Sequence, residues 1–383
     1  MRVLHVVSSA QRRGAEMFAC DLDKALAELG VDQRIALLRC VSSKEVVDFL
    51  SPIDVLAGPG ARSSMGTKFK TVRSLRRLVT SWVPDVVQAH GGEALKYAVP
   101  ACRGRAPVVY RRIGSTPPWM AGGVRRAGHA AIMRRAERVV AVSEATRTET
   151  TDIFRLDPGR VVTIPNGVDV ERATPLVERT TARAGLGIDP SAPVVISVGA
   201  FTEEKDPGAQ VRIALRVLER RPEAVFLMVG DGPLAARTQD AVSAAGMDGS
   251  IRLLGTRADV PDLLAASDVL LLASRTEGMP GILIEAGVAG LPAAAYALAG
   301  VPEVVDDGWT GVLATPGDVA ALAAGVLMLL DDEDARRAMS EKARIQCTER
   351  FDIRAVAATY RSLYDEVTEK RTGDPSTDEA VAR

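Results

Sequence analysis

Residues 267–286 read Ser-Asp-Val-Leu-Leu-Leu-Ala-Ser-Arg-Thr-Glu-Gly-Met-Pro-Gly-Ile-Leu-Ile-Glu-Ala. The apolar run Val269–Leu272 has the length and composition of a buried strand. A loop that contains Glu277 follows, and Pro280 suits the first turn of a helix, where its missing N–H costs little. A buried strand that leads through a loop into a helix is the unit from which parallel α/β sheets are built.

The start of this helix has the chemistry of a binding site. The first backbone amides of a helix have no acceptor within it, and together with the helix dipole they favour phosphate. Glu277 and Glu285 stand on either side of this turn. Because a carboxylate repels phosphate, we expect these two side chains to bind hydroxyl groups. Phosphate and polyol together indicate a nucleotide sugar.

Composition bounds the class of protein. At 383 residues the chain is long enough for two domains. Its 48 basic and 49 acidic residues nearly cancel, which gives no electrostatic case for nucleic acid. No apolar run approaches the ~18 residues of a spanning helix, and the first residues lack a signal-peptide core. We therefore expect a cytoplasmic protein.

Cysteine and histidine are too few and too scattered for a metal centre or a disulfide framework. Unpaired cysteines also fit a reducing compartment. The residues concerned are Cys20, Cys40, Cys102, Cys347, His5, His90 and His129.

Strand and helix patterns alternate along most of the chain, which predicts parallel sheets covered on both faces. Strands are predicted at Val3–Val7, Arg34–Leu38, Val86–Ala89, Val108–Tyr110, Val139–Val142, Val161–Ile164, Val194–Val198, Val225–Val229, Ile251–Leu254, Val269–Leu272 and Pro292–Ala295. Helices are predicted at Glu16–Leu29, Phe69–Trp82, Ala209–Arg220 and Ala235–Ala245, with a helical pattern over Val319–Tyr364.

This alternation predicts two doubly wound, Rossmann-like α/β domains that face each other across a cleft. We expect an N-terminal domain over residues 1–165, a linker over 166–193 and a C-terminal domain over 194–345. Helices at 346–370 are expected to pack back toward the N-terminal domain, and 371–383 to form a disordered tail.

Three strand-to-helix loops of the second half carry further candidates. Lys205 follows the first strand in Glu-Glu-Lys-Asp-Pro, and Val-Gly-Asp-Gly-Pro (229–233) follows the second. Gly255 and Arg257 follow the third. Each is ambiguous alone: a loop lysine is more often only solvated, and Arg257 fits a surface position before a helix capped by Asp259 equally well.

The order and spacing of these fragments closely resemble the C-terminal domain of glycosyltransferase family 4, whose members are retaining enzymes of GT-B fold that use nucleotide-activated sugars. The resemblance is dense from residue 164 to 317, and includes Pro-Asn-Gly-Val-Asp (165–169) and Gly-Val-Pro-Glu-Val-Val (300–305). It is thinner in the first half, at Arg-Gly-Ala-Glu (13–16) and Ala-His-Gly-Gly (89–92).

The resemblance implies a role for each matching residue. Glu285 would hold the ribose, Glu277 would lie near the donor sugar and the reacting centre, and Lys205 would neutralise the leaving group. The amides of Met279, Gly281 and Ile282 would receive the diphosphate, Gly14 would let backbone approach the phosphates, and Gly255 with Arg257 would line the base pocket. It also implies that no divalent metal is needed and favours front-face attack.

The chain departs from the family pattern at three places. Ala200 stands where an arginine often accompanies the lysine, and Arg257 or Arg275 could substitute. Arg13 replaces a second glycine and could supply positive charge. Ile113 stands where many relatives have a histidine. His90 is then the remaining catalytic candidate near the acceptor, although a lone histidine at a strand end is at least as often structural.

The implied activity is transfer of a hexose-type sugar to a glycan, a lipid or a small-molecule natural product. The alternatives are a GT-B-like nucleotide-sugar epimerase and a degenerate nucleotide-sugar-binding partner, which Ala200 and Ile113 keep open. Trp119 and a helix carrying Arg125, Arg126, Arg134, Arg135 and Arg138 could contact the inner face of an anionic membrane. We favour a solvated helix face.

Overall fold

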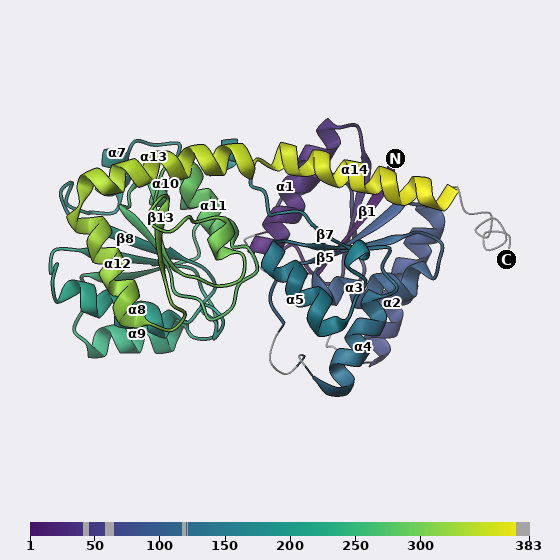
Figure 1. Ribbon diagram of the computed structural model, residues 1–383, viewed down its shortest axis with the longest axis horizontal. Coiled ribbons are helices and arrows are strands. Elements are labelled where there is room, and N and C mark those ends of the chain that lie inside the picture. Colours follow the sequence, from purple (N-terminus) through teal and green to yellow (C-terminus); the bar gives the residue numbers. More distant parts are fainter. Residues whose placement is uncertain (41–45, 58–64, 117–119, 121, 373–383) are drawn as a thin grey trace. The chain divides into compact units, whose positions relative to one another are not determined.

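The computed structural model describes residues 1–40, 46–57, 65–116, 120 and 122–372, which form two α/β units (Figure 1). The first unit comprises Met1–Gly167 and the chain from Ile353 onward, and the second is Val168–Asp352. The chain therefore leaves the first unit once and returns to it for its last helix.

The first unit is built on a parallel sheet of seven strands in the order β3-β2-β1-β4-β5-β6-β7. Its elements are β1 Arg2–Val7, α1 Gly14–Glu28, β2 Asp32–Leu37, β3 Ile53–Val55, α2 Met65–Trp82, β4 Val86–His90, α3 Gly91–Cys102, β5 Val108–Arg112, α4 Gly123–Met133, β6 Arg138–Ala141, α5 Glu144–Phe154, β7 Val161–Thr163 and α14 Ile353–Thr372.

Both faces of this sheet are covered by helices. One core brings Leu75 of α2 and Leu95 of α3 against the strands. On the other, Leu22 of α1 packs with Tyr360 and Tyr364 of α14, and Figure 1 shows α14 lying along α1. The Tyr364 hydroxyl donates to Gln88 Oε1 at 3.0 Å. The last helix thus completes the core of the first unit.

The second unit has a parallel sheet of six strands in the order β10-β9-β8-β11-β12-β13. Its elements are α6 Val170–Ala173, α7 Arg179–Gly185, β8 Val194–Val198, α8 Pro207–Leu218, β9 Val225–Val229, α9 Ala235–Ala244, β10 Ile251–Gly255, α10 Val260–Ala265, β11 Val269–Leu272, α11 Gly281–Val288, β12 Ala293–Tyr296, β13 Gly311–Ala314, α12 Val319–Asp331 and α13 Glu333–Arg350.

Local capping fixes where several of these helices begin. Asp206 caps α8 by accepting from the amide of Ala209 at 3.0 Å, and Pro207 stands at the first helical position. Asp318 and Asp332 cap α12 and α13 in the same way. Such caps stabilise a helix by about 1 kcal/mol each. The cap on α8 fixes the end of the loop that carries Lys205.

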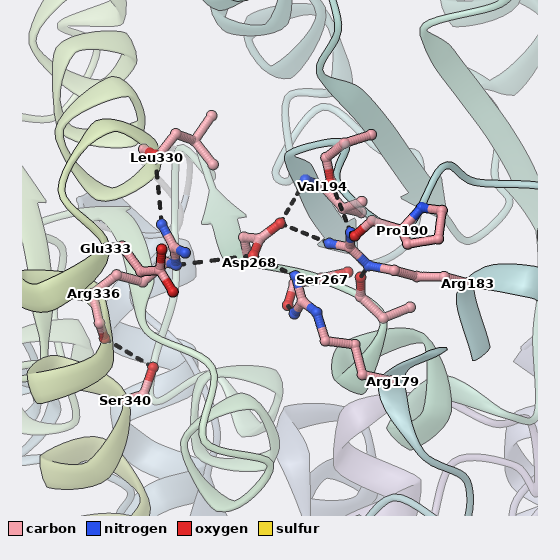
Figure 2. A network of polar contacts seen from close by, with 12 residues as sticks. Arg179, Arg183, Pro190, Val194, Ser267, Asp268, Leu330, Glu333, Arg336 and Ser340 are labelled. Atoms are coloured by element: carbon pink, nitrogen blue, oxygen red, sulfur yellow. Dashed lines mark hydrogen bonds and ion pairs between the residues drawn. The ribbon is translucent and has the colours of Figure 1, made fainter. Parts of the chain in front are cut away.

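The residues expected to form a linker instead carry two helices, α6 and α7. Arg183 of α7 is buried, and its guanidinium donates to Asp268 Oδ2 at 2.9 Å and to the carbonyl of Ala266 at 2.9 Å. Figure 2 shows Arg179 of α7 and Arg336 of α13 directed at the same carboxylate. This network ties α7 to the sheet at the amino ends of β8 and β11.

Three other expectations differ from the structure. The short strands β3 and β13 were not predicted from the sequence. The segment 346–370 divides between units, because α13 ends at Arg350 in the second and α14 starts at Ile353 in the first. Of the expected tail, Arg371 belongs to α14 and donates to the carbonyl of Gly104, whereas 373–383 lie outside the described residues.

Candidate functional site

Each sheet has one place where the strand order reverses, between β1 and β4 in the first unit and between β8 and β11 in the second. In open parallel sheets ligands bind at such a switch point, beyond the carboxyl ends of the strands. In the first sheet, Gly14 follows β1 and His90 ends β4. In the second, Lys205 follows β8 and Glu277 follows β11. All four predicted residues therefore lie at the switch point of their own sheet.

Lys205 and Glu277 meet in the second unit. The Lys205 ammonium donates to Glu277 Oε1 at 2.5 Å, and Glu277 is 8% exposed. The two loops are also joined by the backbone, since the amide of Arg275 donates to the carbonyl of Glu204 at 2.7 Å. Proximity of this cation and carboxylate is a consequence of the strand order, because 72 residues separate them in the chain.

Helix α11 begins beside this pair. Pro280 is its N-cap residue rather than its first helical residue, and Gly281 and Ile282 form its first turn. Gly287 lets the helix lie against α13, because a Cβ at that position would be 2.3 Å from the sulfur of Cys347. The helix therefore packs closely against α13 near its C-terminal end, while its first turn directly follows the loop that carries Glu277.

Glu285 on α11 has a partner that the sequence did not reveal. Arg172 of α6 donates to Glu285 Oε1 at 3.1 Å, and both side chains are about one fifth to one quarter exposed. Arg172 stands three residues beyond the Pro-Asn-Gly-Val-Asp motif, whose Asp169 caps α6 by accepting from the Arg172 amide. The sequence signal that could have located Arg172 is Asp169, which is suited to cap a short helix directly after the motif.

Two glycines, one directly after β9 and one at the end of β10, adopt backbone conformations with positive φ. Gly230 has φ +137°, and a Cβ there would lie 1.9 Å from the carbonyl oxygen of Gly199, so only glycine fits. Gly255 has φ +65° with open space where a Cβ would stand. The loop after β8 can thus pack directly against the loop after β9.

The arginines proposed to replace the missing partner of Lys205 are both engaged. Arg257 donates to both oxygens of Asp259, at 2.8 and 2.5 Å. Asp259 is the N-cap residue of α10 but makes no side-chain cap. Arg275 donates to Asp206 at 2.7 Å. Lys205 thus contacts Glu277, whereas Arg257 and Arg275 pair with other carboxylates.

In the first unit His90 lies at the end of a buried hydrogen-bonded chain. Gln33 Nε2 donates to the carbonyl of Asp23, so Gln33 Oε1 accepts from His5 Nε2 at 2.9 Å. His5 Nδ1 must then accept from His90 Nε2, at 3.0 Å. This order of donors leaves His90 Nδ1 as an acceptor, and it is buried with no partner among the described residues.

Arg111 is buried next to His90 in the sheet register and lies over the ring of Phe18, 3.6 Å from its centroid. One of its terminal nitrogens donates to Asn166 Oδ1. Burial lowers the pKa of Arg111 to about 10, and burial raises the pKa of Glu16 in the first turn of α1. Sequence patterns did not single out Arg111 as a site residue.

Arg13 and Gly14 start α1 on this side of the sheet. Arg13 is the N-cap residue, with extended backbone and no side-chain cap, and both residues are exposed. Open space surrounds the position of a Cβ at Gly14. Within the first unit, packing therefore gives no reason for a glycine at position 14.

All three histidines are expected to make stability depend on pH. Burial lowers the pKa of His5 and of His129, the latter to about 4, and burial, His5 and Arg111 lower that of His90 further. Unfolding then takes up protons below pH 6.5, so stability falls as pH drops, with a limiting slope of about 1.4 kcal/mol per pH unit for one histidine. Glu16, with its raised pKa, acts in the opposite direction at the acidic end.

Urea unfolding at pH 7, 6 and 5 measures this slope. His129→Gln is expected to reduce it by about one proton, because burial, together with Lys96 and Arg112, keeps His129 neutral in the folded chain while it protonates on unfolding. An unchanged slope in this variant would contradict the assignment.

The basic segment considered for a membrane does not form one continuous helix. Helix α4 ends at Met133, and Arg138 starts β6, where it is buried and donates to Glu366 at 2.6 Å. Arg134 donates to the carbonyl of Phe154 at 3.0 Å. Arg125 is exposed and Arg126 is partly so, whereas Trp119 lies outside the described residues.

Two features are absent from the part of the chain that the structure describes. No helix among them is long and apolar enough to cross a membrane. No group of three or more His, Cys, Asp and Glu side chains in the described ranges is arranged to hold a metal ion.

The fold is that of GT-B proteins. The chain resembles the crystal structure of HepE from Anabaena in complex with UDP and glucose, with a TM-score of 0.83 at 21% identity over 95% of this chain and 99% of that one. It also resembles sucrose-phosphate synthase from Thermosynechococcus elongatus, with a TM-score of 0.84 at 18% identity over 97% and 100% of the two chains.

Two family models, "Glycosyl transferases group 1" over residues 178–346 and "Glycosyltransferase Family 4" over residues 12–172, match the second and first halves. The chain belongs to glycosyltransferase family 4, as its motifs predicted.

Two curated relatives illustrate the range of the family. One is N-acetyl-alpha-D-glucosaminyl L-malate synthase of Bacillus anthracis, 29% identical over 61% of this chain and 61% of that protein. Another is 2-deoxystreptamine glucosyltransferase of Streptomyces kanamyceticus, 31% identical over 62% of each. The match spans about three fifths of the length of these relatives.

Proposed function

We propose that this protein is a retaining glycosyltransferase that moves a hexose-type sugar from a nucleoside-diphosphate sugar to an acceptor. The observation that carries the proposal is the Lys205–Glu277 contact of 2.5 Å at the switch point of the second sheet, beside the first turn of α11. A fixed cation and helix amides suit a diphosphate leaving group, and two carboxylates suit the hydroxyls of a sugar and a ribose.

In the proposed reaction the bond between the sugar carbon and the phosphate oxygen breaks as the acceptor oxygen attacks the same face. The acceptor proton passes to the departing phosphate oxygen, so the products are the glycoside and the nucleoside diphosphate. Lys205, with the amides of Gly281 and Ile282, would stabilise the charge that develops on the phosphate. Glu277 would hold Lys205 and contact the donor sugar. We propose no role for a divalent metal.

The acceptor is unassigned, and the first unit is its expected location. His90 Nδ1 can accept a hydrogen bond, because the chain through His5 places the His90 proton on Nε2, and His90 is the candidate there for orienting the acceptor hydroxyl whose proton passes to the phosphate. An inner-membrane-face location remains a proposal that rests on Arg125 and Arg126, and salt-sensitive sedimentation with anionic vesicles would test it.

The family assignment favours the transferase over the epimerase, and a turnover assay separates the transferase from a degenerate binding protein.

A nucleotide panel tests the proposal. Among UDP, GDP, ADP and TDP, we expect UDP to bind best, because the HepE structure contains it. At 100 times its dissociation constant, the preferred nucleotide should raise stability by about 2.7 kcal/mol in thermal unfolding. Slow hydrolysis of the corresponding nucleotide sugar should accompany it. The absence of any shift with all four nucleotides would refute the proposal.

Glu285→Gln tests the proposed contact between Glu285 and the ribose. Loss of a charged acceptor for the ribose hydroxyls should weaken nucleotide binding about tenfold, measured by calorimetry. Glu333→Gln, which changes an exposed carboxylate on α13, is the control and should bind as the wild type does. Equal binding by both variants would remove Glu285 from the ribose site.

A further inference from the structure

A cavity of about 350 Å³ lies in the second unit and does not include Lys205, Glu277 or α11. It lies where α8 and α12 begin, and Figure 1 shows these helices side by side. Polar side chains from four segments line it: Asp206, Arg212, Ser274, Arg275 and Tyr296. Its volume is at the small end of the range for ligand pockets, about 300–1,000 Å³.

Two hydroxyl groups on the cavity wall are buried without a partner. Ser274 is 1% exposed and Tyr296 is 3% exposed, and neither side-chain oxygen has a hydrogen-bond partner among the described residues. A buried polar group left unpaired costs about 1–3 kcal/mol. The phenol of Tyr296 carries its proton at neutral pH and can donate, and burial raises its pKa further. Both residues line the cavity, so a bound molecule that reaches these hydroxyls would supply their missing partners.

The charges of the cavity are mixed. Asp206 and Arg275 hold each other at 2.7 Å, and the exposed Arg212 adds a second guanidinium. Asp206 is a non-glycine residue in left-handed conformation, with φ +42°, a strained geometry of the kind that persists at functional sites. A ligand of high negative charge would be repelled by the Asp206 carboxylate. An uncharged polyol can donate to Asp206 and accept from the arginines.

The remaining wall is apolar. Ala209, Ala273 and Val319 also line the cavity. A sugar ring combines the same two kinds of surface, since it carries hydroxyl groups at its edge and C–H groups on its faces. The volume accommodates one such ring rather than a chain of them.

We propose that this cavity is a second carbohydrate site, which binds one uncharged sugar ring outside the donor site. Ser274 and Tyr296 provide its buried hydroxyls, and Asp206 with Arg212 provides its outer polar wall. The site requires no turnover and does not depend on the transferase activity proposed above.

Saturation-transfer NMR with the full chain tests the site, with D-glucose, D-galactose, D-mannose and N-acetyl-D-glucosamine as probes at saturating UDP. We expect at least one sugar to bind in the millimolar range. Tyr296→Phe and Ser274→Ala should each weaken that binding at least fivefold while they leave UDP affinity unchanged. Tyr360→Phe, which alters a fully buried tyrosine of the first unit, should bind as the wild type does.

Several outcomes would overturn the proposal. One is the absence of sugar binding, and another is equal binding by wild type, Tyr296→Phe and Ser274→Ala. Loss of the signal in Glu277→Gln but not in Tyr296→Phe would place the sugar in the donor site instead. Displacement of the sugar by inorganic phosphate would make the cavity an anion site. Retained UDP affinity shows that each variant is folded.

Discussion

Glu277→Gln is expected to lower kcat for sugar transfer about 100- to 1,000-fold, the cost typical of losing a preorganised charge at a reacting centre. Glutamine keeps the shape of the side chain but removes the charge that fixes the Lys205 ammonium at 2.5 Å. Because Glu277 is 93% buried at its side chain, solvent screens this interaction little. Without it, the ammonium can turn away from the leaving phosphate.

Nucleotide affinity separates this effect from a loss of fold. UDP binding to Glu277→Gln should stay within about threefold of wild type, because the amides of α11 and Glu285 are unchanged. Glu203→Gln is the control: it neutralises an exposed carboxylate in the loop that carries Lys205, 3.8 Å from Arg275, and should leave kcat unaltered. Equal rates for wild type and Glu277→Gln would show that the ion pair serves structure alone.

The sheets were largely predictable because parallel strands are buried on both faces and leave continuous apolar runs. Val194–Val198, Val225–Val229 and Val269–Leu272 were predicted at their observed bounds. The strands that were missed lack such runs. In β3, Ile53 and Val55 are exposed at the sheet edge, and β13 has four residues that begin with glycine.

The linker expectation failed for a related reason. Residues 166–193 show little periodicity because α7 is held by the charge of Arg183 and Arg179, not by an apolar stripe. Patterns of hydrophobic residues do not register a buried arginine whose partner, Asp268, lies 85 residues away. Charged residues that pair over such distances cannot be matched without the fold.

The candidate site was partly predictable for similar reasons. Motifs located Lys205 and Glu277, but their contact depends on β8 and β11 being neighbours at the switch point. Arg172 and His5 were missed. Arg172 gains significance only when α6 approaches Glu285, and His5 sits inside an apolar strand where a single polar residue gives no pattern.

Asp268→Asn is expected to destabilise the second unit by about 3 kcal/mol, because breaking a buried ion pair leaves its partner uncompensated. The carboxylate accepts from Arg183 at 2.9 Å, from Arg179 at 2.5 Å and from the amide of Val194 at 2.8 Å. Asparagine loses the charge and presents an N–H group to donors. For a unit of this size the loss lowers the Tm by about 6 to 12 °C, measured by calorimetry.

Asp331→Asn is the matched control, since that carboxylate is exposed and lies 3.4 Å from Arg221, where an ion pair contributes less than about 1 kcal/mol. A shift for Asp268→Asn no larger than for Asp331→Asn would contradict the role given to the network. The network lies at the amino ends of the strands, and Lys205 and Glu277 lie beyond their carboxyl ends. Folded Asp268→Asn should therefore bind UDP normally at low temperature, which separates what stabilises the second unit from what binds the donor.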